Sequence, residues 1–411
     1  MNPFPRRVLR TAATLAVATA GTVVPLVVSS APADAITLSP SGTVVVTLRG
    51  NGHGHGMSQY GAEGAAGNGL SYGKILGFYY PGTTLTTLAK SQIRVRLSGF
   101  PARTTVAAYS TIAATGVGTL PTRGVAKYRL VASGSGLALQ QLKSAKGATW
   151  RTYRGRLANR TELYRTNGYS TRLYRSDGSS VRYIGRLRAV RAGSGLYTVN
   201  RVSLDSYTAG VVPSEMPVSW RAQAVNAQAV AARTYGRYAV EHRATGSEYD
   251  ICDTTQCQVY GGRKRYDRGG HVVGGDYQPA AKATANRVLR YRGSTIFAQF
   301  SASNGGWSAG GGQPYLTARA DPYDPSAAGN PYIDYRRTVS VRSLASYFGL
   351  AKVTKLAVTK RDGHGTWGGR VLAATLTGTS SSGKATTRRV TGFDLQYAIG
   401  AGTTWFTVRR G

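Results

Sequence analysis

The 411-residue sequence predicts an α+β fold, a single elaborate mixed domain in which a long alanine-rich helix lies against β-sheet and a β-rich insertion is attached. Three observations lead to this prediction. The stretch 220–235 is rich in alanine, with apolar residues at helical spacing. Residues 92–200 contain short alternating segments separated by Asn-Gly and Asp-Gly turns. No low-complexity linker divides residues 36–411.

The first 35 residues have the pattern of an export signal. Three arginines lie within the first ten residues, an apolar run follows over about 12–28, and Ala33-Asp-Ala35 has the form of an A-x-A cleavage site. A membrane anchor is the alternative, but the run is short and contains Thr and Pro. We therefore expect a secreted, extracellular protein that has no transmembrane segment after signal cleavage.

The first half of the chain predicts strands joined by turns. We expect a strand over 37–50, a Gly/His loop over 50–56, a short helical stretch from 57 to about 77, and strands over 93–97 and 183–190. The segments Leu163–Gly168 and Leu173–Gly178 have the form of repeated hairpin turns.

The second half begins with the main helix, predicted from near Pro217 to near Arg243. Its apolar face is expected to carry Val218, Ala222, Val225, Ala229 and Ala232. After it we expect a loop over 260–280 and strands over 288–292 and 296–300. A tight turn over 301–306 that exposes hydroxyls follows. The rest of the chain has alternating helix and strand signals through 343–350 and 371–376 and a closing segment over 405–408.

The composition indicates attraction to polyanions. The formal charge is +35, with 52 basic and 17 acidic residues, and such a field attracts polyanions in a salt-dependent manner. The export signal and the absence of a recognisable nucleic-acid motif argue against nucleic acid. Anionic cell-wall polymers are therefore the expected partners, although the many arginines are also typical of a GC-rich genome.

The two cysteines, Cys252 and Cys257, lie in one short segment. In an exported protein such a pair usually forms a disulfide. The alternative is a zinc site completed by His242 and His271, but nothing in the local sequence makes these histidines converge. We favour the disulfide and expect no cofactor.

The most informative residue is Glu215, one of few acids, in the Pro-bounded segment Val211-Val-Pro-Ser-Glu-Met-Pro217 before the long helix. A carboxyl group in this setting is explained better by catalysis than by solvation, although a helix-capping role is the alternative. A helix N-terminus and the cation Arg233 would both lower the pKa of Glu215, whereas a general acid needs a raised one. Burial beside Met216 and Trp220 would offset them.

Four segments together resemble the SpoIID/LytB family: Leu204–Pro217, the helix ending at Tyr235, Tyr249–Tyr260, and Ser301-Ala-Ser-Asn-Gly-Gly306. The resemblance implies lytic transglycosylation of denuded peptidoglycan glycan strands, or enhancement of a peptidoglycan amidase, with a sporulation-related or more general wall role. It implies that Glu215 is the catalytic acid and that Arg233 supports activity.

Two departures from the family pattern stand out. The segment Gly52-His-Gly-His-Gly-Met-Ser-Gln-Tyr-Gly61 normally lies near the C-terminal end of the domain, which suggests a circular permutation. Gln256 stands where some zinc-binding relatives have His. We divide the chain into the signal peptide (1–35), an N-terminal segment completing the main domain (36–90), a β-rich region (91–200) and the catalytic core (201–411).

Further candidate site residues come from the same motifs. We expect Gln228, His53, Ser58, Gln59 and Ser303 to bind substrate, although each is also compatible with a structural role. Tyr79, Tyr80 and Trp307 are candidate rings for stacking on sugars. Asp205, Asp250 and Asp253 are the alternative carboxylates of a two-acid hydrolase.

The sequence therefore predicts an exported lytic transglycosylase that uses one Glu as acid and then as base and leaves 1,6-anhydro ends. The alternative is a non-catalytic wall-binding protein that enhances an amidase. The expected partners are peptidoglycan strands, anionic wall polymers and, for the alternative, the amidase.

Overall fold

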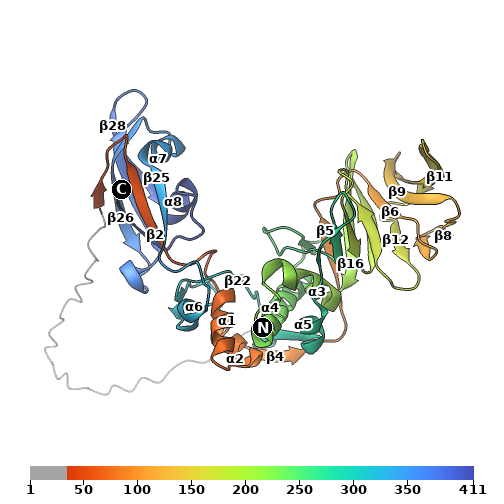
Figure 1. The fold of residues 1–411 in the computed structure, drawn as a ribbon, viewed down its shortest axis with the longest axis horizontal. Helices are drawn as coiled ribbons and strands as arrows, with labels where there is room; N and C mark the ends of the chain where they lie inside the picture. Colours follow the sequence, from red (N-terminus) through yellow and green to blue (C-terminus); the bar gives the residue numbers. More distant parts are fainter. Residues whose placement is uncertain (1–34) are drawn as a thin grey trace, which may run out of the picture.

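The computed structural model describes residues 35–411, so the predicted signal peptide lies outside the described residues except for Ala35. The fold is a mixed α+β arrangement, as predicted. It is elongated, with a β-rich region at one end, a helical centre and a second β-containing lobe at the other end (Figure 1).

The β-rich region consists of two large sheets. One has the order β17 (Ile251–Cys252), β5 (Gln92–Leu97), β16 (Gly195–Ser203), β15 (Arg186–Ala192), β12 (Glu162–Arg165), β7 (Ile112–Ala114) and β8 (Gly118–Thr119). The other has the order β11 (Trp150–Leu157), β10 (Gly136–Lys143), β9 (Val125–Ser133), β6 (Thr104–Ala107), β13 (Thr171–Tyr174), β14 (Ser180–Tyr183), β18 (Lys264–Tyr266) and β19 (Val272–Gly275). Their inner faces share one apolar core, in which Val95, Leu130 and Leu187 are fully buried.

The helical centre contains α1 (Gln59–Gly67), α2 (Tyr72–Tyr79), α3 (Leu204–Glu215), α4 (Ala222–Glu241), α5 (Gln278–Ala283) and α6 (Tyr323–Ser326). Small sheets surround it: β21 (Ser294–Thr295), β20 (Arg287–Tyr291) and β4 (Thr84–Thr87); β22 (Phe300–Ser301) and β3 (Met57–Ser58); and β23 (Trp307–Ser308) and β24 (Arg319–Ala320).

The far lobe joins the two ends of the described chain. One sheet has the order β25 (Tyr335–Ser340), β2 (Thr43–Leu48) and β29 (Phe406–Arg410), and the other has the order β1 (Ala35–Thr37), β26 (Lys352–Arg361), β27 (Val371–Thr379) and β28 (Ala385–Thr391). The helices α7 (Val341–Tyr347) and α8 (Gly392–Ala398) and the short 3₁₀ helix η1 (Thr366–Gly368) complete it. Residues from both ends, such as Val46 and Phe406, share its core.

Helix α4 is the central element of the fold. It begins at Ala222 rather than near Pro217, and Val218 lies exposed before it. The predicted single apolar face is incomplete, because all but one of the residues from Ala224 to Thr234 are buried. Alanine allows this, since its small side chain lets neighbouring helices approach from several sides.

Several predicted boundaries are wrong for identifiable reasons. Residues 260–280 form the hairpin β18–β19 and the start of α5 rather than a loop. The predicted strand 183–190 is split between two sheets at Gly185, which has a φ of 86°. The Asp177-Gly178 turn closes a true hairpin between β13 and β14, whereas the Asn167-Gly168 turn connects two different sheets.

Candidate active site

Glu215 is the last residue of helix α3, not a residue before a helix N-terminus as predicted. Pro213 lacks a backbone N–H, and Met216, which precedes Pro217, adopts the extended conformation that proline favours in its predecessor. The chain therefore leaves the helix at Glu215. The helix-capping alternative fails for the same reason, because a carboxylate caps the opposite end of a helix.

This placement reverses the predicted electrostatics. The C-terminal end of a helix carries partial negative charge and disfavours a carboxylate. Burial raises the pKa of the Glu215 carboxyl, and a hydrogen bond from the Val259 amide, 2.6 Å from Oε1, opposes that rise. A raised pKa is the condition that a general acid requires.

Glu215 lines a cavity of about 410 Å³ formed by six segments that are far apart in the sequence. The wall consists of the N-terminal Gly/His loop, the end of helix α3, helix α4 at Tyr235, the cysteine loop, the strand at β22, and Gly402. The lining residues are Asn51, Gly52, His53, Glu215, Tyr235, Thr255, Gln256, Cys257, Gln299, Phe300, Ser301, Ala302 and Gly402. Glu215 is the one carboxylate among these residues, all of which belong to the described range.

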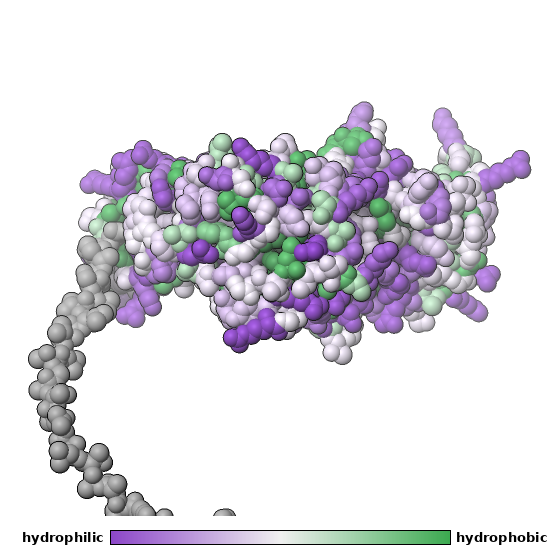
Figure 2. Space-filling model, turned by 90° about the horizontal axis from the view of Figure 1, so that it is seen from below, coloured by the Kyte–Doolittle hydropathy of each residue, from purple (hydrophilic) through white to green (hydrophobic). Residues whose placement is uncertain are grey.

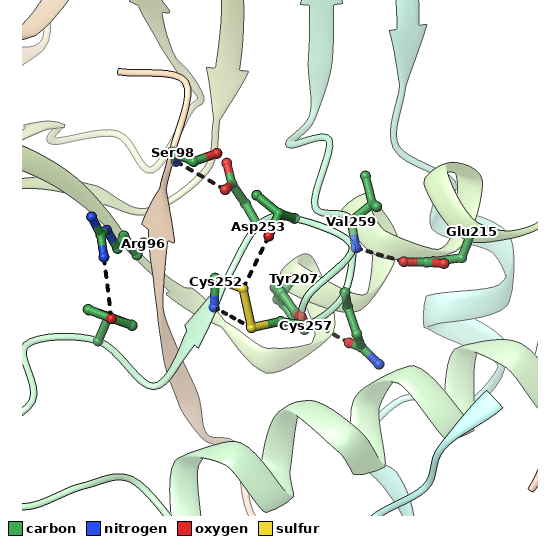
Figure 3. The surroundings of a disulfide bond; sticks show 11 residues. Arg96, Ser98, Tyr207, Glu215, Cys252, Asp253, Cys257 and Val259 are labelled. Carbon is green, nitrogen blue, oxygen red and sulfur yellow. Dashed lines mark hydrogen bonds between the residues drawn. A yellow bond between two sulfur atoms is a disulfide. The ribbon is translucent and has the colours of Figure 1, made fainter. Parts of the chain in front are cut away.

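The cysteine loop holds the carboxyl group in place. Cys252 and Cys257 form a disulfide with Cα atoms 5.6 Å apart, and the loop leads directly to Val259, whose amide contacts Glu215 (Figure 3). The hydroxyl of Tyr207 on α3 donates to Gln258 at 2.9 Å and ties the loop to the helix that carries Glu215. His242 and His271 lie elsewhere, against Tyr238 and Asp267 respectively.

Removal of the disulfide is expected to weaken activity more than stability. On the chain-entropy model so short a loop contributes about 2 kcal/mol to the free energy of unfolding. The double variant Cys252→Ser/Cys257→Ser should show a modest drop in melting temperature and a several-fold lower rate of glycan cleavage, because the Val259 amide loses its fixed position. Rate measurements and thermal unfolding test this, and an unchanged rate would show that the loop does not position Glu215.

The Gly/His loop brings His53 into the same cavity. Burial, followed by the charges of His55 and Arg370, lowers the pKa of His53 to about 4, so its imidazole is neutral near pH 7. Its Nδ1 accepts a hydrogen bond from the His55 amide at 2.9 Å. The remaining ring proton is therefore on Nε2, which is a hydrogen-bond donor.

Glycine is required beside His53 for steric reasons. Gly52 has a φ of 103°, and a Cβ there would lie 2.6 Å from the Cβ of Ser301. Gly56 has a φ of 63°, and a Cβ there would lie 2.1 Å from the carbonyl oxygen of Gln299. The loop and the β22 strand can therefore approach closely enough to form one wall.

The other predicted substrate-binding residues are buried outside the cavity lining. Ser58 and Ser303 both donate hydrogen bonds to the carboxylate of Asp324, Ser303 at 2.8 Å. Gln59 donates to Gln228 at 3.4 Å in the interior. The 301–306 turn thus buries the hydroxyl of Ser303, whereas Ser301 lines the cavity.

Asp324 is the centre of this buried polar network. Its carboxylate also accepts hydrogen bonds from the backbone amides of Asn304 and Gly305, each at 3.1 Å. The neighbouring Asp321 accepts from the Tyr79 hydroxyl at 2.8 Å, and burial together with the charge of Asp324 raises the pKa of Asp321 to about 6. The network fixes the 301–304 segment behind the cavity wall.

Arg233 lies in the interior and is absent from the cavity lining. Its guanidinium pairs with Asp205 at 2.7 Å and donates to the carbonyl of Ala281 and the hydroxyl of Thr284. It does not contribute to the pKa shift of Glu215. The predicted direct role for this cation is replaced by a structural one, in which it joins α3, α4 and α5.

The candidate sugar-stacking rings and second carboxylates also lie elsewhere. Tyr79 and Tyr80 are buried, and Trp307 stacks on His364. The carboxylates of Asp250 and Asp253 accept hydrogen bonds from Arg94 and from the Ser98 amide.

Sequence reasoning missed several lining residues. Three of them lie within or directly beside the recognised motifs: Tyr235, Gln256 and Phe300. Their closeness to those motifs could have identified them as site residues. Asn51 likewise lies directly beside the Gly52–Gly61 motif, whereas Gly402 carried no signal, because it meets Asn51 only when the two ends of the chain pair.

Sequence comparisons show which known proteins this chain is similar to. Residues 192–291 match the SpoIID family model, described as a stage II sporulation protein. The chain is 38% identical over 122 residues to the amidase enhancer of Bacillus subtilis (strain 168), which covers 28% of this chain and 15% of that protein. It is 30% identical over 172 residues to stage II sporulation protein D of Bacillus amyloliquefaciens, covering 38% of this chain and 48% of that protein.

A third relative, stage II sporulation protein D of Bacillus subtilis (strain 168), is 28% identical over 205 residues, which are 46% of this chain and 57% of that protein. The chain therefore spans 15% to 57% of the length of these relatives. Residues 192–291 are thus similar to the SpoIID family, in agreement with the resemblance that the motifs indicated, and they include Glu215, α4 and the disulfide loop.

Proposed function

We propose that this protein is an exported lytic transglycosylase that cleaves peptidoglycan glycan strands between N-acetylmuramic acid and N-acetylglucosamine. One observation carries the proposal: among the described residues that line the cavity, Glu215 is the single carboxylate, and its pKa is raised. A hydrolase would need a second carboxylate to activate water or to attack the sugar, whereas a lytic transglycosylase does not.

The reaction proceeds with Glu215 first as acid and then as base. The Val259 amide holds Oε1, so the other carboxyl oxygen delivers its proton to the glycosidic oxygen. As the C1–O bond breaks, positive charge develops on the sugar, which the newly formed carboxylate stabilises. The C6 hydroxyl of the muramyl residue attacks C1 and returns its proton to Glu215, leaving a 1,6-anhydro end.

Neighbouring groups suit a neutral sugar chain. His53 is uncharged, and the partly buried Tyr235 and the exposed Gln256 supply polar contacts in the same cavity. Such a lining binds hydroxyl and acetamido groups without placing a second charge beside the reacting bond.

A second candidate is a non-catalytic role as an amidase enhancer. The relative with that name supports it, since it is 38% identical to this chain over 122 residues. In this reading the cavity binds glycan without cleaving it, and an amidase is the partner. Both candidates place the protein at the cell wall, and within residues 35–411 no helix is long and apolar enough to cross a membrane.

Mass analysis of products from defined glycan strands tests the proposal. We expect 1,6-anhydro ends, and a rate that falls as the pH rises through the raised pKa of Glu215, because only the protonated acid can start the reaction. Reducing ends would indicate a hydrolase. No products at any pH, together with retained glycan binding and amidase stimulation, would favour the enhancer.

A further inference from the structure

The outer face of the eight-stranded sheet carries a row of cations. Along β9, Tyr128 and Leu130 point into the core, so the alternate residues Lys127 and Arg129 lie on the opposite face. Arg172 on β13 continues the row toward β14 and β18. In the space-filling view, hydrophilic residues cover much of the β-rich end of the molecule, on the right (Figure 2).

A cavity of about 230 Å³ opens among these cations. Four basic side chains line it, together with three aromatic rings and no acidic residue. The lining residues are Phe100, Pro101, Arg103, Thr105, Lys127, Arg129, Leu142, Trp150, Tyr174, Arg175 and Ser176. It is separate from the Glu215 cavity, with which it shares no lining residue.

The positive charge in this cavity is not neutralised within the protein. Across residues 35–411, none of its four basic side chains forms an ion pair with a carboxylate. Burial and the nearby charge of Arg103 lower the pKa of Arg129, and burial and Arg172 lower that of Lys127. Like charges held together in this way favour an external anion.

Aromatic rings hold the cations in position. Arg129 lies over Trp150 at 4.2 Å from the ring centre, and Lys127 lies over Tyr174 at 4.0 Å. Farther along, Arg172 lies over Tyr266 at 4.2 Å. These contacts reduce the entropy that the side chains lose on binding, and they occupy ring faces on which a nucleic-acid base would otherwise stack.

We propose that this face is a binding site for a linear anionic polymer whose phosphodiesters link sugars or polyols, with one phosphate in the cavity at Arg103, Lys127 and Arg129. The covered ring faces favour such a polymer over nucleic acid. The site goes beyond the proposed glycan cleavage and does not depend on Glu215. Experiments can therefore refute polymer binding at this face without refuting glycan cleavage, and the reverse.

Binding of fluorescent poly(glycerol phosphate) of fixed length to the whole protein tests the site. The variant Arg103→Gln/Lys127→Gln/Arg129→Gln is expected to lose about tenfold or more in affinity and to show a shallower dependence of log K on log salt than the wild type. The matched control Arg336→Gln/Arg389→Gln/Arg409→Gln removes the same charge from exposed positions on the far lobe and should lose no more than about threefold.

Equal losses in the two triple variants would overturn the site, because binding would then follow net charge alone. Tighter binding of single-stranded DNA with the same number of phosphates, lost in the same variant, would overturn the ligand assignment. If the triple variant does not fold by circular dichroism, Ser176→Asp at the rim replaces it. This substitution adds a negative charge without altering the ring contacts and should weaken binding at least threefold; unchanged affinity would count against the site.

Discussion

A Glu215→Gln variant is expected to form 1,6-anhydro products on the order of 10²- to 10⁴-fold more slowly than the wild type. The amide cannot deliver a proton to the leaving oxygen or accept one from the C6 hydroxyl. Its side-chain oxygen can still accept the hydrogen bond from the Val259 amide, so the local geometry is retained. Product formation is measured by mass analysis, and wall binding by sedimentation with cell-wall fragments.

The stability of the Glu215→Gln variant shows whether a fall in its activity comes from the missing acid or from impaired folding. The pKa of Glu215 is raised in the folded protein, so the stabilisation due to protonation is present at low pH and is lost as pH rises through the folded pKa. At neutral pH the amide should therefore melt no lower than the wild type. Glu241→Gln, at the end of α4, is the matched control with unchanged activity. Wild-type rates in Glu215→Gln would refute the assignment of the acid.

An Asp324→Ala variant is expected to lose on the order of 3–5 kcal/mol in the free energy of unfolding. The substitution leaves the Ser58 hydroxyl and the Asn304 amide without their acceptor in a buried site. Activity should fall as well, because the same network fixes the segment behind the cavity wall. Thermal unfolding by circular dichroism and the cleavage rate measure the two effects.

The control for Asp324→Ala is Glu241→Ala, which breaks an exposed pair with Arg237 in one helix. Such a pair is worth only about 0.3–0.5 kcal/mol. If Asp324→Ala and Glu241→Ala have similar melting temperatures, the Asp324 network does not hold the segment at Ser58 and the segment at Asn304 together.

The family resemblance and the fold class were more predictable from sequence than the surroundings of Glu215. The family, the mixed fold and the position of β2 and β20 could be read from motifs and alternation. The position of Glu215 in its helix could not, because Pro213 within the last turn suggested a turn rather than the end of a helix. That single difference changes the sign of the helix-dipole effect on the acid.

Buried polar residues explain most of the remaining errors. Ser58, Ser303 and Gln228 have the same side chains as sugar-binding residues, and only the tertiary structure shows that their partners are internal. Arg233 was predicted to act on Glu215 because it lies on the helix that follows Glu215, but its guanidinium turns to Asp205. Whether a polar group faces solvent or an internal acceptor depends on contacts between distant segments, which local sequence does not contain.

The position of β2 between β25 and β29 has a consequence for biosynthesis. The strand is translated early, whereas its partner β29 and Gly402, which lies beside Asn51 in the cavity, are translated much later. A nascent polypeptide therefore cannot complete this sheet, or this side of the cavity, before residues 402–410 have been synthesised.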